Sequence, residues 1–208
     1  MSIEVAHREF IPGTTGWSAS DLDDPVIERK WLAGRYEIVE GVLTQMPAAY
    51  FDGGGALEEI LHLIRMHIDA VNTGGKLAIE VDLVLGDLRV PIVDAVYLSA
   101  DDRIKQKQAN ASRGREKLRY GRILVPPTLV IESISLGHEA HDRVTKRRWY
   151  AEAKVPNYWI LDALQHSLEC LVLEGEDYRV DQSGREAAEL RPSMFPGLVI
   201  PLARLWVE

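Results

Sequence analysis

The chain has 208 residues, 46% of them hydrophobic and 27% charged, which is the composition of a globular protein large enough to bury a core. No apolar run reaches the ~20 residues that a membrane span needs, and the opening MSIEVAHREF lacks the basic-then-apolar layout of a secretion signal. The net charge of −8 argues against indiscriminate binding to nucleic acid, since such binding depends on cations that neutralise phosphates.

The N-terminal part of the chain alternates helical and strand patterns. Residues 18–21 (SASD) resemble a helix-capping box, which predicts a helix that starts near Ser18 or Ser20. The run YEIVEGVLTQM over 36–46 predicts two short strands joined by a tight turn at Glu40-Gly41. A longer helix is then expected, because apolar residues recur at helical spacing, namely Leu57, Ile60, Leu61, Ile64 and Ile68.

Strands dominate the middle of the chain, with helices on both sides of them. The elements expected there are strands over 77–85, 91–98 and 128–133, a helix over 140–153, strands over 157–162 and 168–173, and a hairpin around 177–180. This order predicts an α/β fold in which a mixed central β-sheet is flanked by helices, with extra β-hairpins. No linker divides the chain, so we expect a single domain over residues 1–208.

Two acidic residues stand inside otherwise apolar strands. Glu132 lies in PTLVIES and Asp94 in VPIVDAVYL. A buried carboxylate is costly to desolvate unless a cation or hydrogen bonds compensate it. If the two strands are neighbours, both carboxylates can hold one hard divalent cation, with the backbone carbonyl of Ser133 as a further oxygen ligand. The alternatives are backbone hydrogen bonds for Asp94 and a buried arginine for Glu132.

Lys146 belongs to the helix that directly follows the Glu132 strand. A lysine there can lean back over the C-terminal end of that strand, where it could orient a water molecule and offset negative charge. Asp142 stands four residues earlier, so the two residues could equally form a surface pair on one helical face.

Basic residues are concentrated between Arg103 and Arg122, where Glu116 is the only acid. Lys146, Arg147 and Arg148 form a second basic cluster. Both groups could be solvated surface, or they could form two walls beside a polyanion. The candidate contacts to nucleic acid are Arg113, Arg115, Lys117, Arg119, Arg147 and Arg148.

Cys170 is the only cysteine, so an intramolecular disulfide is excluded. It lies in the alternating run SLECLVL, which favours a thiol buried in a sheet over a nucleophile. A single cysteine also fits a reducing compartment, and the cytoplasm is the expected location.

The order of these motifs resembles that of the PD-(D/E)XK nucleases, and more narrowly the Uma2 family (DUF820). The resemblance covers about residues 35–201, through RYEIVEGVLTQMP, VDAVYLS and the block from PTLVIESIS to VPNYWILD. It implies a restriction-endonuclease-like core. The lysine usually found two residues after the glutamate is Ile134 here, and the family places it on the next helix, which corresponds to Lys146.

The resemblance implies a role for each matching residue. Asp94 and Glu132 would bind Mg²⁺, or Mn²⁺ as an alternative, and Lys146 would assist the attacking water. Three further matches would support the site, namely Glu37, Ser135 and Asp142.

The function expected from the sequence is a divalent-metal-dependent endonuclease that acts on DNA. Two rivals stay open: a catalytically silent module that binds nucleic acid or a protein partner, and a structural oligomerisation domain. A homodimer is one candidate assembly. Divalent-ion binding and salt-sensitive DNA binding would separate the three readings.

Overall fold

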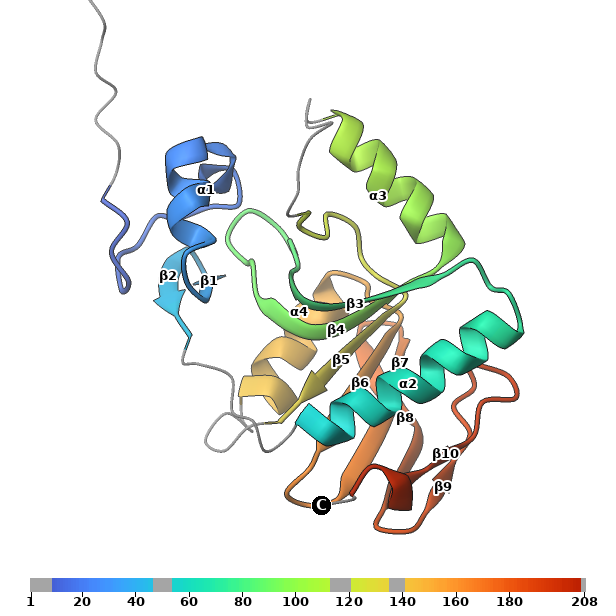
Figure 1. Cartoon of the computed structure of the whole chain (residues 1–208). Coiled ribbons are helices and arrows are strands. Elements are labelled where there is room, and N and C mark those ends of the chain that lie inside the picture. The colour runs from blue at the N-terminus through green and yellow to red at the C-terminus, as the bar shows by residue number, and fades with distance from the viewer. Residues whose placement is uncertain (1–8, 47–53, 113–120, 135–140, 207–208) are drawn as a thin grey trace, which may run out of the picture.

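A six-stranded mixed sheet organises the computed structural model, which describes residues 9–46, 54–112, 121–134 and 141–206 (Figure 1). The strand order is β3-β4-β5-β6-β7-β8, and every neighbouring pair is antiparallel except β5 and β6. The strands are β3 (Lys76–Asp82), β4 (Ile92–Leu98), β5 (Leu129–Ser133), β6 (Asn157–Asp162), β7 (Ser167–Glu174) and β8 (Asp177–Arg185). A parallel pair requires a crossover connection, and the chain between β5 and β6 provides it as helix.

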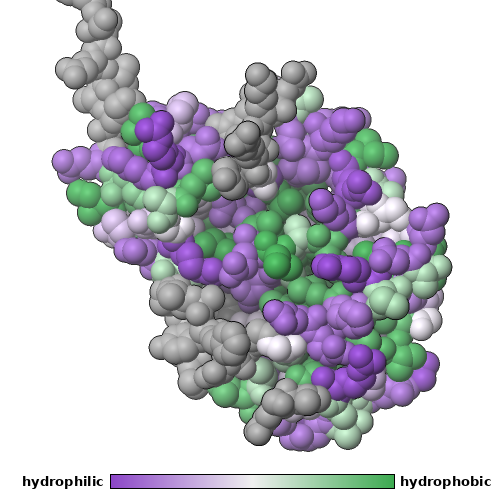
Figure 2. Space-filling model, in the orientation of Figure 1, coloured by the Kyte–Doolittle hydropathy of each residue, from purple (hydrophilic) through white to green (hydrophobic). Residues whose placement is uncertain are grey.

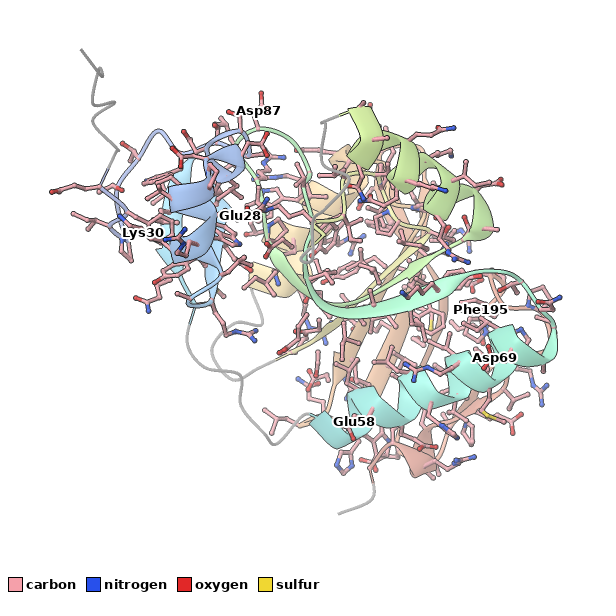
Figure 3. The ribbon with its side chains drawn as sticks, turned by 45° about the horizontal axis from the view of Figure 1, so that its top comes forward. Glu28, Lys30, Glu58, Asp69, Asp87 and Phe195 are labelled. Carbon is pink, nitrogen blue, oxygen red and sulfur yellow. The ribbon has the colours of Figure 1, made fainter. Side chains whose placement is uncertain are left out.

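Helices cover both faces of this sheet. α2 (Gly54–Ala70) packs its apolar stripe on one face, together with β9 (Glu189–Leu190), β10 (Ile200–Pro201) and the short turn η4 (Leu202–Arg204). Figure 3 marks the two ends of α2 by Glu58 and Asp69. α4 (Arg147–Glu152) packs on the other face through Tyr150 and Ala151. The predicted mixed sheet flanked by helices is therefore confirmed.

The N-terminal residues build a small core of their own. Its elements are η1 (Asp21–Asp23), α1 (Pro25–Trp31), β1 (Tyr36–Val39) and β2 (Val42–Gln45), and Figure 3 marks α1 by Glu28 and Lys30. Two backbone hydrogen bonds between Ile38 and Val90, of 3.1 and 2.9 Å, join this hairpin to the chain just before β4. β1 is thus fixed beside the strand that carries Asp94.

The helix expected from Ser18 or Ser20 begins later. Asp21 accepts a hydrogen bond from the Ser18 N–H at 2.7 Å, which closes the turn that leads into the short 3-10 helix η1. α1 starts at Pro25, where Asp24 caps it by accepting from the Val26 N–H at 2.7 Å. Proline is well suited to the first helical position because its missing N–H would have no helical partner.

α3 (Ala100–Ser112) shows that the first part of the basic segment is a regular helix. Its buried residues, Asp102 and Gln106, are both polar. Asp102 accepts hydrogen bonds from the backbone N–H groups of Ser99 and Thr128, at 3.1 and 3.0 Å. Gln106 accepts from the Leu124 N–H and donates to the Arg122 carbonyl, each at 2.8 Å. Polar side chains therefore anchor α3 to main-chain groups.

Arg122 departs from the expectation of a solvated basic wall. Its side chain is 6% exposed and lies 3.5 Å from a Glu28 carboxylate oxygen and 3.6 Å from one of Asp82. Trp31 donates to the same Asp82 oxygen at 2.7 Å. Arg122 is buried because it joins α1 to β3, so this end of the basic segment is structural.

The molecular surface mixes hydrophilic and hydrophobic residues. Figure 2 shows hydrophobic residues gathered near the middle of the visible face, between α2 and α3. The edge strand β3 runs through this region, and its Ile79 is 57% exposed. Within the described part of the chain, no helix is both long and apolar enough to cross a membrane.

Candidate active site

Asp94 and Glu132 lie together because β4 and β5 are neighbours. Ala95 is opposite Ile131 in the antiparallel register. Asp94 precedes Ala95 and Glu132 follows Ile131, so the two acids lie next to this pair on their strands. The Asp94 N–H donates to Glu132 Oε2 at 3.4 Å, and the Ser133 N–H donates to Asp94 Oδ2 at 2.7 Å. Each carboxylate thus contacts the backbone of the other strand, on the sheet face that α4 covers.

Lys146 reaches back over the end of β5, as the sequence predicted. Its Nζ donates to Glu132 Oε1 at 2.9 Å, and the two side chains are 7% and 2% exposed. The Tyr150 hydroxyl donates to the same Glu132 oxygen. Lys146 and Tyr150 are four residues apart, so one helical face presents both.

The helix that carries these residues is not the single α-helix expected over 140–153. A π-helical segment, η3 (His141–Lys146), comes first, and α4 begins at Arg147. π-helical turns are rare and occur frequently at functional sites. Here the change to α geometry falls directly after Lys146.

Tyr150 is the site residue that sequence reasoning missed. It is fully buried, and an aromatic residue on the inner face of a helix is typical of an ordinary core. Its spacing of four residues from Lys146 was the available signal. Burial and then the charge of Glu132 raise its pKa well above the usual value, so the hydroxyl stays a neutral donor.

Electrostatics leave Asp94 partly protonated near neutrality. Burial, followed by the charge of Glu132, raises the pKa of Asp94 to about 7. The Ser133 N–H and Lys146 oppose this rise without cancelling it. Two carboxylates therefore share a site that favours one negative charge over two.

We expect Asp94→Asn to stabilise the metal-free protein at pH 8. The pKa of Asp94 is about 7 in the folded protein, above the ordinary value of 3.8, so the folded protein keeps a proton that the unfolded chain has already lost. The free energy of unfolding therefore falls as the pH rises from 3.8 through 7. Asparagine does not titrate, so its advantage should be on the order of 2 kcal/mol at pH 8, after a discount for partial exposure, and should shrink toward pH 4.5. Urea unfolding in EDTA at both pH values measures it. An advantage independent of pH would contradict the assignment.

The donor set fits a hard divalent cation. The side-chain ligands are carboxylate oxygens, and a cation between them would relieve the repulsion that raises the pKa of Asp94. Among the described residues, no group of three or more His, Cys, Asp or Glu side chains could hold a metal ion. A cation here would therefore rely on two carboxylates, the Ser133 carbonyl and water, which suits Mg²⁺ better than a structural zinc.

Glu37 lies close to this site without joining the acid pair. It is 1% exposed, and its Oε1 accepts from the Ile92 N–H at 2.9 Å, two residues before Asp94. Its charge also contributes to the raised pKa of Tyr150. Glu37 thus holds the start of β4. Ser135 and the side chain of Asp142 fall outside the described residues.

The basic candidates differ in their surroundings. Arg147 donates to Asp177 at 3.0 and 3.2 Å and to the Tyr178 carbonyl at 2.7 Å, so it is tied to β8. Arg148 is 62% exposed and lies 3.7 Å from Glu152. Of these two arginines of α4, Arg148 is therefore the more accessible. The structure does not describe the segment that holds Arg113, Arg115, Lys117 and Arg119.

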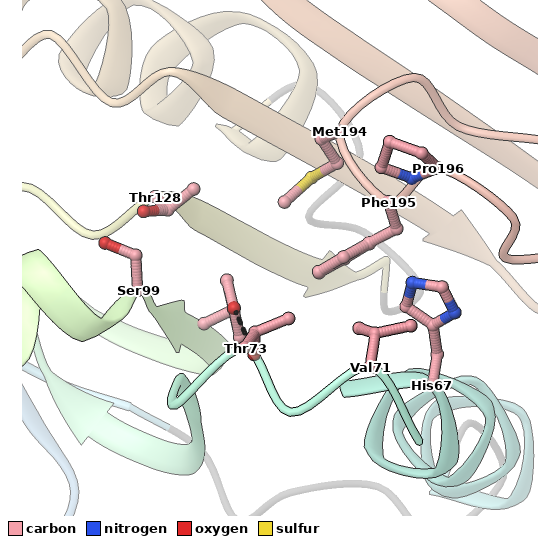
Figure 4. Close-up of a pocket in the computed structure, with 9 residues that line it drawn as sticks. His67, Val71, Thr73, Ser99, Thr128, Met194, Phe195 and Pro196 are labelled. Carbon is pink, nitrogen blue, oxygen red and sulfur yellow. Dashed lines mark hydrogen bonds between the residues drawn. The ribbon is translucent and has the colours of Figure 1, made fainter. Parts of the chain in front are cut away.

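A cavity of about 450 Å³ lies away from the acid pair (Figure 4). Ser99, just beyond β4, and Thr128, just before β5, line it together with apolar side chains such as Phe195 and Met194. These positions are at the opposite ends of the two strands from Asp94 and Glu132. The cavity is thus separate from the candidate active site.

The mixed sheet, with two acids on neighbouring strands and a lysine on the next helix, defines a restriction-endonuclease-like protein. The Uma2 family model, described as "Putative restriction endonuclease", matches residues 30–203, and the chain belongs to this family. A crystal structure from Anabaena variabilis ATCC 29413, titled as a "putative nuclease belonging to DUF820", superposes with a TM-score of 0.61 at 14% identity. The match covers 82% of this chain and 89% of that one, and at this identity it shows the fold alone. None of the curated proteins matches the chain.

Proposed function

We propose that this protein is a divalent-metal-dependent endonuclease that hydrolyses phosphodiester bonds, with DNA as its substrate. The observation that carries the proposal is the meeting of Asp94, Glu132 and Lys146 on one face of the sheet. Membership of the Uma2 family supports the same class of reaction.

In this proposal Asp94, Glu132 and the Ser133 carbonyl hold the cation. When bound, Mg²⁺ or Mn²⁺ would lower the pKa of a water ligand and compensate negative charge at the phosphate. Lys146 orients the attacking water and stabilises the negative charge that develops on the phosphoryl oxygens. Hydrolysis joins the water oxygen to phosphorus and breaks the bond from phosphorus to the leaving oxygen.

Arginine and lysine side chains around the acid pair are the proposed contacts to the DNA backbone. Arg148 is the best placed among the described residues, because it is exposed and close in sequence to Lys146. Arg147 belongs to the same proposed surface, together with Arg113, Arg115, Lys117 and Arg119. A local basic surface is compatible with a net charge of −8, because charge distribution decides where a polyanion binds.

We expect the wild-type protein to nick supercoiled DNA in Mg²⁺ or Mn²⁺ and to lose this activity in EDTA. Glu132→Gln keeps the side-chain shape but removes the charge, so the cleavage rate should fall by about 10³-fold or more. Gel analysis of plasmid topology measures the rate. The matched control is Glu152→Gln, which changes an exposed acid at the end of α4 and should cleave normally.

Two outcomes would count against this function. Cleavage by Glu132→Gln at the wild-type rate would remove the acid pair from the mechanism. Salt-sensitive DNA binding without divalent-ion binding would support the catalytically silent module instead.

A further inference from the structure

The two oxygens of Glu132 have different surroundings. Oε1 accepts from Lys146 Nζ at 2.9 Å and also from the Tyr150 hydroxyl. Oε2 accepts from the Asp94 N–H at 3.4 Å, which is a long hydrogen bond. Side-chain donors therefore hold Oε1, while Oε2 lies on the side of Asp94.

Packing fixes the position of the Tyr150 hydroxyl. The Tyr150 ring meets the Tyr158 ring edge-on at 5.0 Å, and the Tyr158 ring lies 5.8 Å from that of Tyr178. The Tyr178 hydroxyl in turn donates to the Val155 carbonyl at 2.7 Å. This tyrosine cluster (Tyr150, Tyr158 and Tyr178) joins α4, β6 and β8. Because the ring is enclosed, the hydroxyl cannot swing away from Glu132.

Lys146 and Tyr150 differ in how firmly they can hold the carboxylate. Lysine carries its charge on a flexible four-carbon stem, so Nζ can move to another partner. A tyrosine side chain has two torsions, and both are restricted here by burial and by the tyrosine cluster. A phenylalanine would fill the same space, so the distinct contribution of the hydroxyl is its charge-assisted hydrogen bond to Glu132.

We infer that Tyr150 is a positioning residue, which orients Glu132 so that Oε2 remains on the Asp94 side as a cation ligand. This inference rests on the proposed function, because it assumes that the acid pair binds a divalent ion. Lys146 is then released from holding Glu132 and can turn toward the reacting phosphate. Groups that orient metal ligands in this way influence metal affinity as well as rate.

The test compares Tyr150→Phe with Tyr178→Phe in the full chain. Both variants lose one buried hydroxyl from the same tyrosine cluster, and of the two hydroxyls it is that of Tyr150 that donates to Glu132. Free Mn²⁺ measured by electron paramagnetic resonance, without DNA, gives the affinity for the ion. Tyr150→Phe should weaken Mn²⁺ binding by about 10-fold or more, and Tyr178→Phe by less than about twofold.

Kinetics on a short DNA duplex give the second readout. Tyr150→Phe should lower kcat at saturating Mn²⁺ by about 10-fold and leave the KM for DNA within about twofold, because Tyr150 is buried away from the substrate. Tyr178→Phe should retain both constants. If Tyr150 had only a structural role, Tyr150→Phe would not lower kcat at an unchanged KM while Tyr178→Phe kept both constants.

The outcomes distinguish this inference from the function on which it rests. Equal Mn²⁺ affinity in Tyr150→Phe and the wild type would overturn the positioning role alone, and so would equal losses in both variants. A wild-type protein that binds no Mn²⁺ would overturn the proposed function, and the inference with it. If Tyr150→Phe does not fold, the ultraviolet difference spectrum of the wild type on adding Mg²⁺ provides the test. A tyrosine band shift that Glu132→Gln abolishes supports the inference, and an unchanged band overturns it.

Discussion

Replacing Lys146 with methionine is expected to abolish DNA cleavage and to destabilise the metal-free protein. The ammonium group is lost from the place where phosphoryl charge would develop, so the rate should fall by about 10³-fold or more. The same change leaves Glu132, 2% exposed, without its cationic partner. Breaking a buried ion pair costs about 3 kcal/mol or more. Plasmid nicking and urea unfolding in EDTA measure the two effects.

Two further variants make the Lys146 result specific. Lys154→Met changes an exposed lysine just after α4 and should leave both cleavage and stability near wild type. Lys146→Arg should remain inactive, because a planar guanidinium does not replace a compact ammonium in a tight site. Normal cleavage by Lys146→Met would exclude Lys146 from the reaction.

Arg122→Met is expected to be among the most destabilising single changes outside the acid pair. The guanidinium lies between Glu28 and Asp82, both partly buried, and burial already raises the pKa of Asp82. Without the cation, Asp82 keeps only its hydrogen bond from Trp31 among these contacts. The free energy of unfolding, measured in urea, should fall by about 3 kcal/mol.

The matched control for Arg122 is Arg148→Met, in which an exposed arginine pairs with surface acids. Such pairs contribute about 0–1 kcal/mol, so little change is expected. A double-mutant cycle with Asp82→Asn then isolates the coupling between Arg122 and Asp82. A coupling near zero would show that Arg122 acts through packing of its stem and not through charge.

The acid pair could be predicted because burial restricts what an acid can do. A carboxylate within an apolar strand needs a compensating partner, and Asp94 and Glu132 occupy two such strands. Lys146 followed from its place directly after the Glu132 strand. The hairpin turn was equally readable, since Glu40 and Gly41 adopt positive φ values of 48° and 78°, as a tight hairpin requires.

Other features depend on tertiary contacts that local patterns do not encode. Nothing in the composition of residues 140–153 separates a π-helical segment from an α-helix. Arg122 stands in a cationic run, and its burial depends on acids that are distant in the chain, Glu28 and Asp82. The hydroxyl of Tyr150 acquires its role only when α4 meets β5.

The way α3 is attached determines which substitutions the protein should tolerate around it. Asp102 and Gln106 bond largely to backbone N–H and C=O groups. These groups do not depend on which side chain stands at the partner position. We therefore expect Leu124 to accept many substitutions without loss of the anchor, proline excepted because it lacks the N–H that Gln106 receives. A change at Gln106 itself would remove both of its bonds to the main chain at once. In relatives that keep this attachment, variation should concentrate on the connecting segment while the two polar helix positions stay constant.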